Sequence, residues 1–95
     1  MQVKELASFY EAIKEDNRIS VSHIAIYMAF FQCWNHNDFQ NPIQVRRSEI
    51  MQAAKISGLA TYHRCIKELH EYGYITYLPS FNPAVYSQVV ILRKK

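Results

Sequence analysis

Hydrophobic side chains recur along the first part of the chain with the spacing of a helix. Over residues 3–16 they fall three or four positions apart, and charged side chains occupy the opposite face. This pattern predicts an amphipathic helix that buries one stripe. Residues 20–37 carry apolar side chains almost all round, and Ser20 is placed to cap the helix that they predict. Such a helix is either central to a core or shared between two subunits.

A polar segment ends the second helix, and a short extended piece is expected at residues 43–45. The next periodic stretch predicts a third helix over about residues 48–55, with Ser48 available as its cap. A turn of about four residues follows, and then a fourth helix over about residues 60–72.

The two glycines of the chain fall at the ends of these elements. Gly58 is expected to take a positive φ in the turn, and Gly73 is expected to end the fourth helix in the left-handed region. Ala60 is a poor helix cap, so we expect Thr61 or Ser57 to cap the fourth helix instead.

Aromatic and β-branched residues fill two further stretches, residues 74–78 and 86–92. The segment between them, residues 79–85, contains two prolines, so the pattern predicts a β-hairpin with a seven-residue tip. We expect Phe81 in this tip to pack under the hairpin. The chain is thus expected to be one domain, residues 1–95, mainly α with a small β-hairpin.

Charge is unevenly placed along a chain whose composition otherwise suits a single core. Of the 95 residues, 49% are hydrophobic and 20% are charged, and the formal net charge is +3. Residues 1–17 carry two lysines and four acidic residues, whereas residues 43–78 carry five basic and three acidic residues and residues 79–95 carry three basic residues. The basic second half favours an acidic partner such as nucleic acid.

A helix, a turn and a second helix make a helix-turn-helix, whose second helix enters the DNA major groove. With a hairpin behind it, the stretch over residues 48–69, followed by Tyr72-Gly73-Tyr74-Ile75, resembles the winged-helix pattern of bacterial regulators and replication-organiser proteins. The resemblance covers residues 20–92 and implies that residues 60–72 are the recognition helix. Residues 1–17 would then be an additional N-terminal helix.

A narrower resemblance involves the parts around this motif. The aromatic-rich helix over residues 20–37 and the run Pro79-Ser80-Phe81-Asn82-Pro83 are similar to small winged-helix proteins of bacterial mobile elements and to phage replisome organisers. The resemblance implies that the run forms a wing beside the DNA.

The recognition helix is predicted to have a core side and an outward side. At about 100° per residue, Tyr62, Ile66 and Leu69 share the core side, with Cys65 beside them. Glu68 and Glu71 are expected where the helix leaves the groove. The expected DNA contacts are Thr61, His63, Arg64 and Lys67 on this helix, Arg46, Arg47 and Lys55 on the phosphate backbone, and Ser80 and Asn82 at the wing tip. Arg46 and Arg47 suit a solvated surface equally well.

No metal, cofactor or catalytic group is expected. His63 and His70 lie about 10 Å apart along a helix axis, too far to share an ion, and Cys33 with His36 makes at most half a site. Two isolated glycines cannot form a phosphate-binding loop, and the acidic residues form no pair suited to acid–base catalysis. Cys33 and Cys65 are expected to be buried free thiols in a reducing compartment.

The sequence therefore predicts a protein without enzymatic activity that binds double-stranded DNA as a transcriptional regulator. The alternatives are an accessory factor of replication or transposition, and a winged-helix module that binds protein. A homodimer through helices 3–16 and 20–37 is expected. No small-molecule ligand is expected. The longest apolar stretch, residues 24–34, has about half the roughly 20 residues that span a bilayer, so we expect a cytoplasmic protein.

Overall fold

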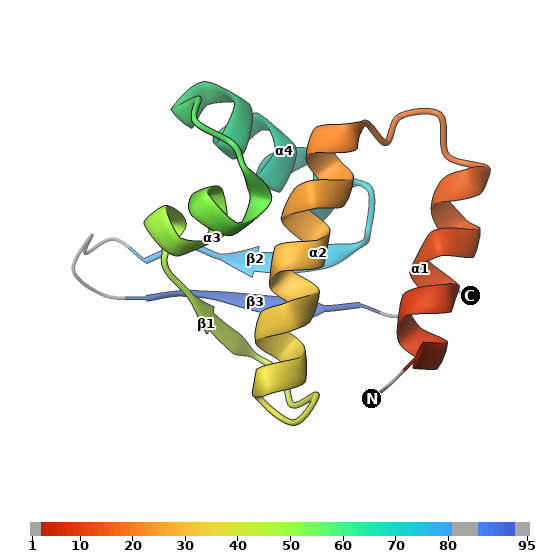
Figure 1. Cartoon of the computed structure of the whole chain (residues 1–95), viewed down its shortest axis with the longest axis horizontal. Coiled ribbons are helices and arrows are strands. Elements are labelled where there is room, and N and C mark those ends of the chain that lie inside the picture. Colours follow the sequence, from red (N-terminus) through yellow and green to blue (C-terminus); the bar gives the residue numbers. More distant parts are fainter. Residues whose placement is uncertain (1–2, 81–85, 93–95) are drawn as a thin grey trace.

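The computed structural model describes residues 3–80 and 86–92, which form four helices and three strands (Figure 1). A mainly helical chain with a small β part was expected, and this is confirmed. In chain order, the elements are α1 (Val3–Lys14), α2 (Val21–His36), β1 (Ile43–Val45), α3 (Arg47–Ala54), α4 (Leu59–Glu71), β2 (Ile75–Leu78) and β3 (Ser87–Ile91). Among the described residues, no helix is both long and apolar enough to cross a bilayer.

The sheet has three antiparallel strands in the order β1-β3-β2, where the sequence predicted a two-stranded hairpin. The extended piece at residues 43–45 forms β1, and Ile43 pairs with Val89 while Val45 pairs with Ser87. The side chains of Ile43 and Val45 are buried, and the intervening Gln44 is exposed. Local pattern identified this strand but not its partner, because the pairing joins segments far apart in the chain.

The helix α2 is central to the core of the single chain. Its buried apolar side chains lie on several sides of the helix, with α3 and α4 to one side of it and α1 to the other (Figure 1). Ser20 caps the helix as predicted, since its hydroxyl accepts a hydrogen bond from the backbone N–H of His23. The apolar residues that α2 buries are Ile26, Tyr27, Ala29, Phe30, Phe31 and Trp34.

Aromatic stacking and one carboxylate attach α1 to the rest of the chain. Phe9 stacks on Tyr27 with ring centroids 3.6 Å apart, and it meets the edge of Tyr74 at 5.7 Å. After the helix, Asp16 accepts hydrogen bonds from Arg18 and from the Tyr74 hydroxyl, both at 2.8 Å. The bonds from Arg18, helped by the one from Tyr74, hold the pKa of Asp16 well below its ordinary value although burial opposes them. Burial and the bond to Asp16 raise the pKa of Tyr74 to about 12.

The turn between α3 and α4 bends at a residue that the sequence did not predict. Gly58 has a φ of −85°, so the expectation that it takes a positive φ is wrong. Lys55 takes this role with a φ of 62°, and the next N–H, that of Ile56, donates to the carbonyl of Met51 at 2.9 Å. Gly73 has a φ of 85° and follows α4 in the left-handed region, as predicted.

The predicted caps of α3 and α4 are also wrong. Ser48 lies inside the first turn of α3, because Arg46 continues from β1 in an extended conformation and occupies the cap position without a capping hydrogen bond from its side chain. At α4 the cap position belongs to Gly58, with no side-chain cap, and neither Thr61 nor Ser57 fills it. Both helices begin one residue earlier than the sequence indicated.

Substituting each glycine by alanine tests these backbone assignments. Gly73→Ala is expected to lower the free energy of unfolding by about 1–2 kcal/mol, because an L side chain is strained in the left-handed region. Gly58→Ala is the matched control and should change it by less than about 0.5 kcal/mol. Its φ suits any residue, and the smaller conformational freedom of the unfolded chain offsets the poorer helix cap that alanine makes. A Cβ at Gly58 would also fit without a clash, since its nearest neighbour, Thr61 Oγ1, would lie at an ordinary contact distance of 3.5 Å. Equal losses of unfolding free energy in the two variants, measured by urea denaturation, would contradict the assignment of the left-handed conformation to Gly73 alone of the two glycines.

Candidate nucleic-acid interface

The helix α4 has one face in the core and one face in solvent, as the sequence predicted. Its buried side chains are Tyr62, Cys65, Ile66 and Leu69. Thr61 is half-buried at the boundary between the two faces. The exposed side chains are those of Leu59, Ala60, His63, Arg64, Lys67, His70 and Glu71. Burial of the four core side chains fixes the outward direction of the exposed side chains, because the helix is one rigid element.

The two cations on the outward face of α4 are each paired with a carboxylate one turn further along. Arg64 Nη1 lies 3.2 Å from Glu68 Oε1, and Lys67 Nζ lies 3.9 Å from Glu71 Oε1. Such exposed pairs contribute little to stability. They do mean that a DNA phosphate or base would compete with these carboxylates for Arg64 and Lys67.

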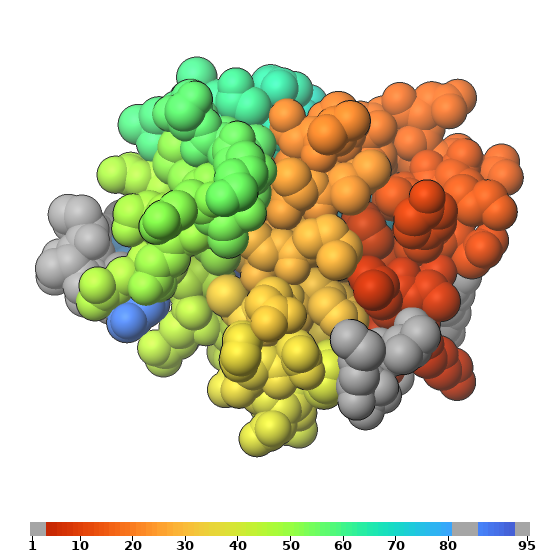
Figure 2. Space-filling model, in the orientation of Figure 1, coloured from red at the N-terminus to blue at the C-terminus, as the bar shows by residue number. Residues whose placement is uncertain are grey.

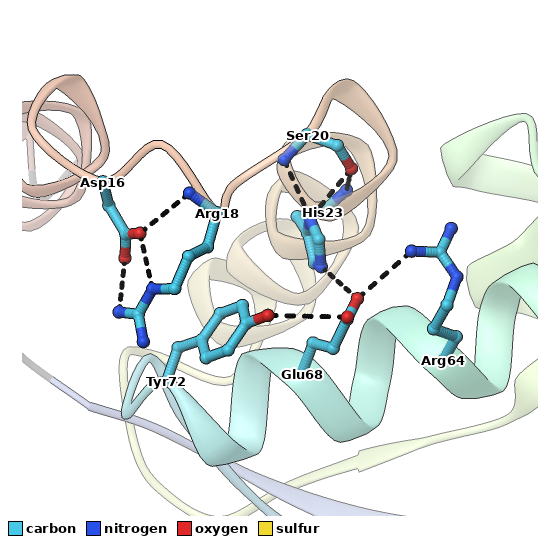
Figure 3. Close-up of polar contacts among 7 residues, drawn as sticks. All are labelled: Asp16, Arg18, Ser20, His23, Arg64, Glu68 and Tyr72. Carbon is cyan, nitrogen blue, oxygen red and sulfur yellow. Dashed lines mark hydrogen bonds and ion pairs between the residues drawn. The ribbon is translucent and has the colours of Figure 1, made fainter.

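Glu68 joins α4 to the beginning of α2 through a buried histidine (Figure 3). The side chain of His23 is 2% exposed, and its Nδ1 accepts a hydrogen bond from the Ser20 backbone N–H at 2.8 Å. The ring proton therefore lies on Nε2, which donates to Glu68 Oε1 at 2.9 Å. The other carboxylate oxygen accepts from the Tyr72 hydroxyl at 3.4 Å, and Arg64 approaches from the solvent side.

This network gives Glu68 a contact that the sequence did not predict. Its expected place, where the helix leaves the groove, stays a prediction, and the structure adds that Glu68 is half-buried and contacts a residue 45 positions away. A local signal for half of the network was present, because Ser20 and His23 have the spacing of a capping box. The hydrogen bond from His23 to Glu68 forms only when α2 and α4 pack together, so no local sequence pattern predicts it.

Two residues of this network and Cys65 form the one trio of metal-ligand type found among the residues the structure describes. Ligand atoms of His23, Cys65 and Glu68 lie within 4.8 Å of one another. Their hydrogen bonds favour a polar contact over a metal site, since Nε2 carries the proton that it donates to Glu68. Burial also raises the pKa of the Cys65 thiol, which opposes the thiolate that a metal binds. Both cysteines are free, but Cys33 is only half-buried.

A second group of cations lies where β1 runs into α3, and we call Arg46 and Arg47 the β1–α3 corner. Both side chains are exposed, and within the described residues neither forms an ion pair. The Arg46 guanidinium lies over the ring of Tyr86, 4.5 Å from its centroid. Lys55 is exposed at the other end of α3. The sequence did not single out Tyr86 as a partner of Arg46.

The base of the predicted wing is tied together at Ser87. The Ser87 hydroxyl oxygen accepts from the Tyr77 hydroxyl and from the Ser80 backbone N–H, each at 3.3 Å. Ser80 is therefore half-buried at the base of the hairpin. Asn82, the other predicted wing contact, lies outside the described residues, as does Phe81 with its expected packing.

These groups lie on the side of α2 that is remote from α1. In Figure 2, α2 runs through the middle of the face, with α3 and the turn after it on the left and α1 on the right. The guanidinium, ammonium and imidazole groups of α4 and the corner are hydrogen-bond donors that suit phosphate oxygens and the acceptors of base edges.

Known proteins give no further guide to this surface. Comparisons of the chain with protein families, with curated proteins and with solved structures found no match. Function therefore has to be inferred from the described side chains and their geometry.

Removing the Glu68 carboxylate tests whether the buried contact holds α4 against α2. Glu68→Ala leaves the Nε2–H of His23 buried without an acceptor, and we expect the free energy of unfolding to fall by about 2–3 kcal/mol. The matched control is Glu71→Ala, which removes the exposed partner of Lys67 and should change it by less than about 0.5 kcal/mol. Urea denaturation at neutral pH measures both. Equally small losses would mean that the His23–Glu68 bond does not hold the two helices together.

Proposed function

We propose that this chain binds double-stranded DNA with α4 in the major groove, and that it regulates transcription. The observation that carries the proposal is the division of α4 into a buried and an exposed face. His63, Arg64 and Lys67 project from the exposed face, and Ala60 leaves room for close approach to the bases. A helix held in this way enters a groove without losing any contact with its own core.

The order of the elements supports a winged helix. The helices α3 and α4 follow one another across a four-residue turn, residues 55–58, which is the order of a helix-turn-helix. The strands β2 and β3 come next as an antiparallel pair, and their connection would be the wing. In this proposal β1 is the third strand of the winged-helix sheet.

Charge supports the same side of the molecule. Residues 1–17, which include α1, carry four acidic residues against two lysines, whereas residues 43–78 carry five basic and three acidic residues. We assign Thr61, His63, Arg64 and Lys67 to bases or to nearby phosphates. The backbone contacts would come from Arg46, Arg47 and Lys55, and from the wing with Ser80 and Asn82.

One observation favours a second candidate, a winged-helix module that binds protein. The carboxylates of Glu68 and Glu71 offset the cations of Arg64 and Lys67. Leu59, at the start of α4, is apolar and 46% exposed. A face of this kind suits a protein surface as well as DNA. An accessory factor of replication or transposition would use the same DNA interface, and the identity of the bound sequence would separate it from a regulator.

A homodimer through α1 and α2 remains part of the proposal, since two-fold DNA sites are read by symmetric dimers. Most apolar side chains of α2 are buried within their own chain. The exposed large apolar side chains on these two helices are those of Tyr10, Val21 and Met28.

Titration of a labelled mixed-sequence duplex at several salt concentrations tests DNA binding. With about five phosphate contacts, log affinity should fall against log salt with a slope of about −4 to −5. Replacing Arg64 and Lys67 together by alanine should weaken binding about tenfold or more and make the slope shallower by about 1–2. Thermal stability should hardly change, because both side chains are exposed.

The matched control is Lys14→Ala on α1, which removes an exposed lysine that is likewise paired with a carboxylate of its own helix. It should leave DNA affinity unchanged. Absence of duplex binding at low salt, or an equal loss in the Lys14 variant, would contradict the proposed interface.

A further inference from the structure

We propose that Tyr86 is a positioning residue that holds the Arg46 guanidinium ready for a backbone phosphate of the duplex. This inference rests on the proposed DNA-binding function and adds to it a role for the base of the wing. It concerns the β1–α3 corner, which differs in its electrostatics from the outward face of α4.

The cations of the corner are available in a way that those of α4 are not. Arg64 and Lys67 would have to leave the carboxylates of Glu68 and Glu71 to meet a phosphate. Arg46 and Arg47 have no such carboxylate partner in the described part of the chain. An anion that binds at the corner therefore breaks no ion pair, and phosphate affinity is expected to be concentrated there.

The register of the sheet explains why Tyr86 meets Arg46. Val45 in β1 pairs with Ser87 in β3, so the antiparallel register places the next residue of one strand opposite the preceding residue of the other. Arg46 is still extended, with φ −107° and ψ 131°, before α3 begins. Arg46 and Tyr86 thus meet as a cross-strand pair, with Arg46 Cζ 4.5 Å from the centroid of the Tyr86 ring.

Among the described residues, the Arg46 guanidinium forms no ion pair beside this contact, so its N–H donors are available to a phosphate. A ring engages the flat face of an arginine, whereas the N–H donors of the arginine point outward in its plane. The ring therefore limits the side chain to a few orientations without using the donors that a phosphate requires. Tyr86 itself is 38% exposed, so it acts at the surface and not as part of the core.

The start of α3 adds attraction for the same anion. Arg46 occupies the cap position, and its side chain forms no capping hydrogen bond. Arg46 is followed directly in the chain by the positive end of the α3 helix dipole and by the exposed side chain of Arg47, the first residue of α3. A phosphate held by Arg46 would be favoured by both.

A double-mutant cycle on the full chain tests the inference with a labelled mixed-sequence duplex and anisotropy. Tyr86→Leu should weaken binding about threefold to tenfold, whereas the matched control Tyr86→Phe, which keeps the ring, should stay within about twofold of wild type. Arg46→Ala should weaken binding and make the salt slope shallower by about 0.9, the value for one phosphate. In the Arg46→Ala background, Tyr86→Leu should have no further effect.

Arg46→Lys keeps the charge but not the flat guanidinium, so it provides a second line of evidence. It should bind less tightly than wild type and should be less sensitive to Tyr86→Leu, because an ammonium does not stack flat on a ring. The midpoints of urea denaturation should be similar for all these variants, because both residues are exposed.

The outcomes separate this inference from the proposed function. If wild type binds the duplex and Tyr86→Leu has no effect, or weakens binding equally with and without Arg46, the positioning role is overturned and the DNA-binding proposal stands. If wild type fails to bind the duplex at low salt, both are overturned.

Discussion

The burial of one side of α4 against α2 and the sheet is the contact on which the functional proposal depends. Tyr62, Cys65, Ile66 and Leu69 are almost completely removed from water when this helix packs. Since successive side chains of a helix project in fixed directions, burial of this set turns the opposite set toward solvent. The buried hydrogen bond between His23 and Glu68 adds a constraint on how α4 sits along α2, because neither polar group tolerates burial without a partner.

Features that depend on local sequence were predictable. The helices follow from the spacing of apolar residues, the cap at Ser20 from its side chain, and the end of α4 from the conformational freedom of Gly73. The two faces of α4 also followed, because helical geometry alone relates Tyr62, Ile66 and Leu69. For the same reason the outward direction of Arg64 and Lys67, the central pair of the candidate site, was predictable.

Features that depend on contacts between distant segments were not predictable. Pairing of β1 with β3 turned an expected hairpin into a three-stranded sheet, and with it came the contact between Arg46 and Tyr86. The left-handed conformation at Lys55 costs roughly 1–2 kcal/mol, so local preference favoured Gly58. In the folded chain the packing of α3 and of α4 against α2 outweighs that preference. The contact of Glu68 with His23 was missed for the same kind of reason, since the partner is on another helix.

In the proposed DNA interface, the arrangement of charge would separate two tasks. On α4 the cations carry their own carboxylates, which would weaken nonspecific attraction and leave room for discrimination by base edges. At the β1–α3 corner the arginines lack such partners in the described residues, which suits sequence-independent anchoring. Glu68 contributes to both structure and charge, because it accepts from His23 in the interior and from Arg64 at the surface.

Mapping of backbone amide shifts by NMR, with isotope-labelled protein and an unlabelled duplex, tests the location of the interface most directly. The account predicts that the largest shifts fall on the first half of α4, on Arg46 and Arg47, and at the start of β3, while the amides of α1 hardly move. Shifts concentrated on α1 and the exposed side of α2, with α4 unaffected, would contradict it.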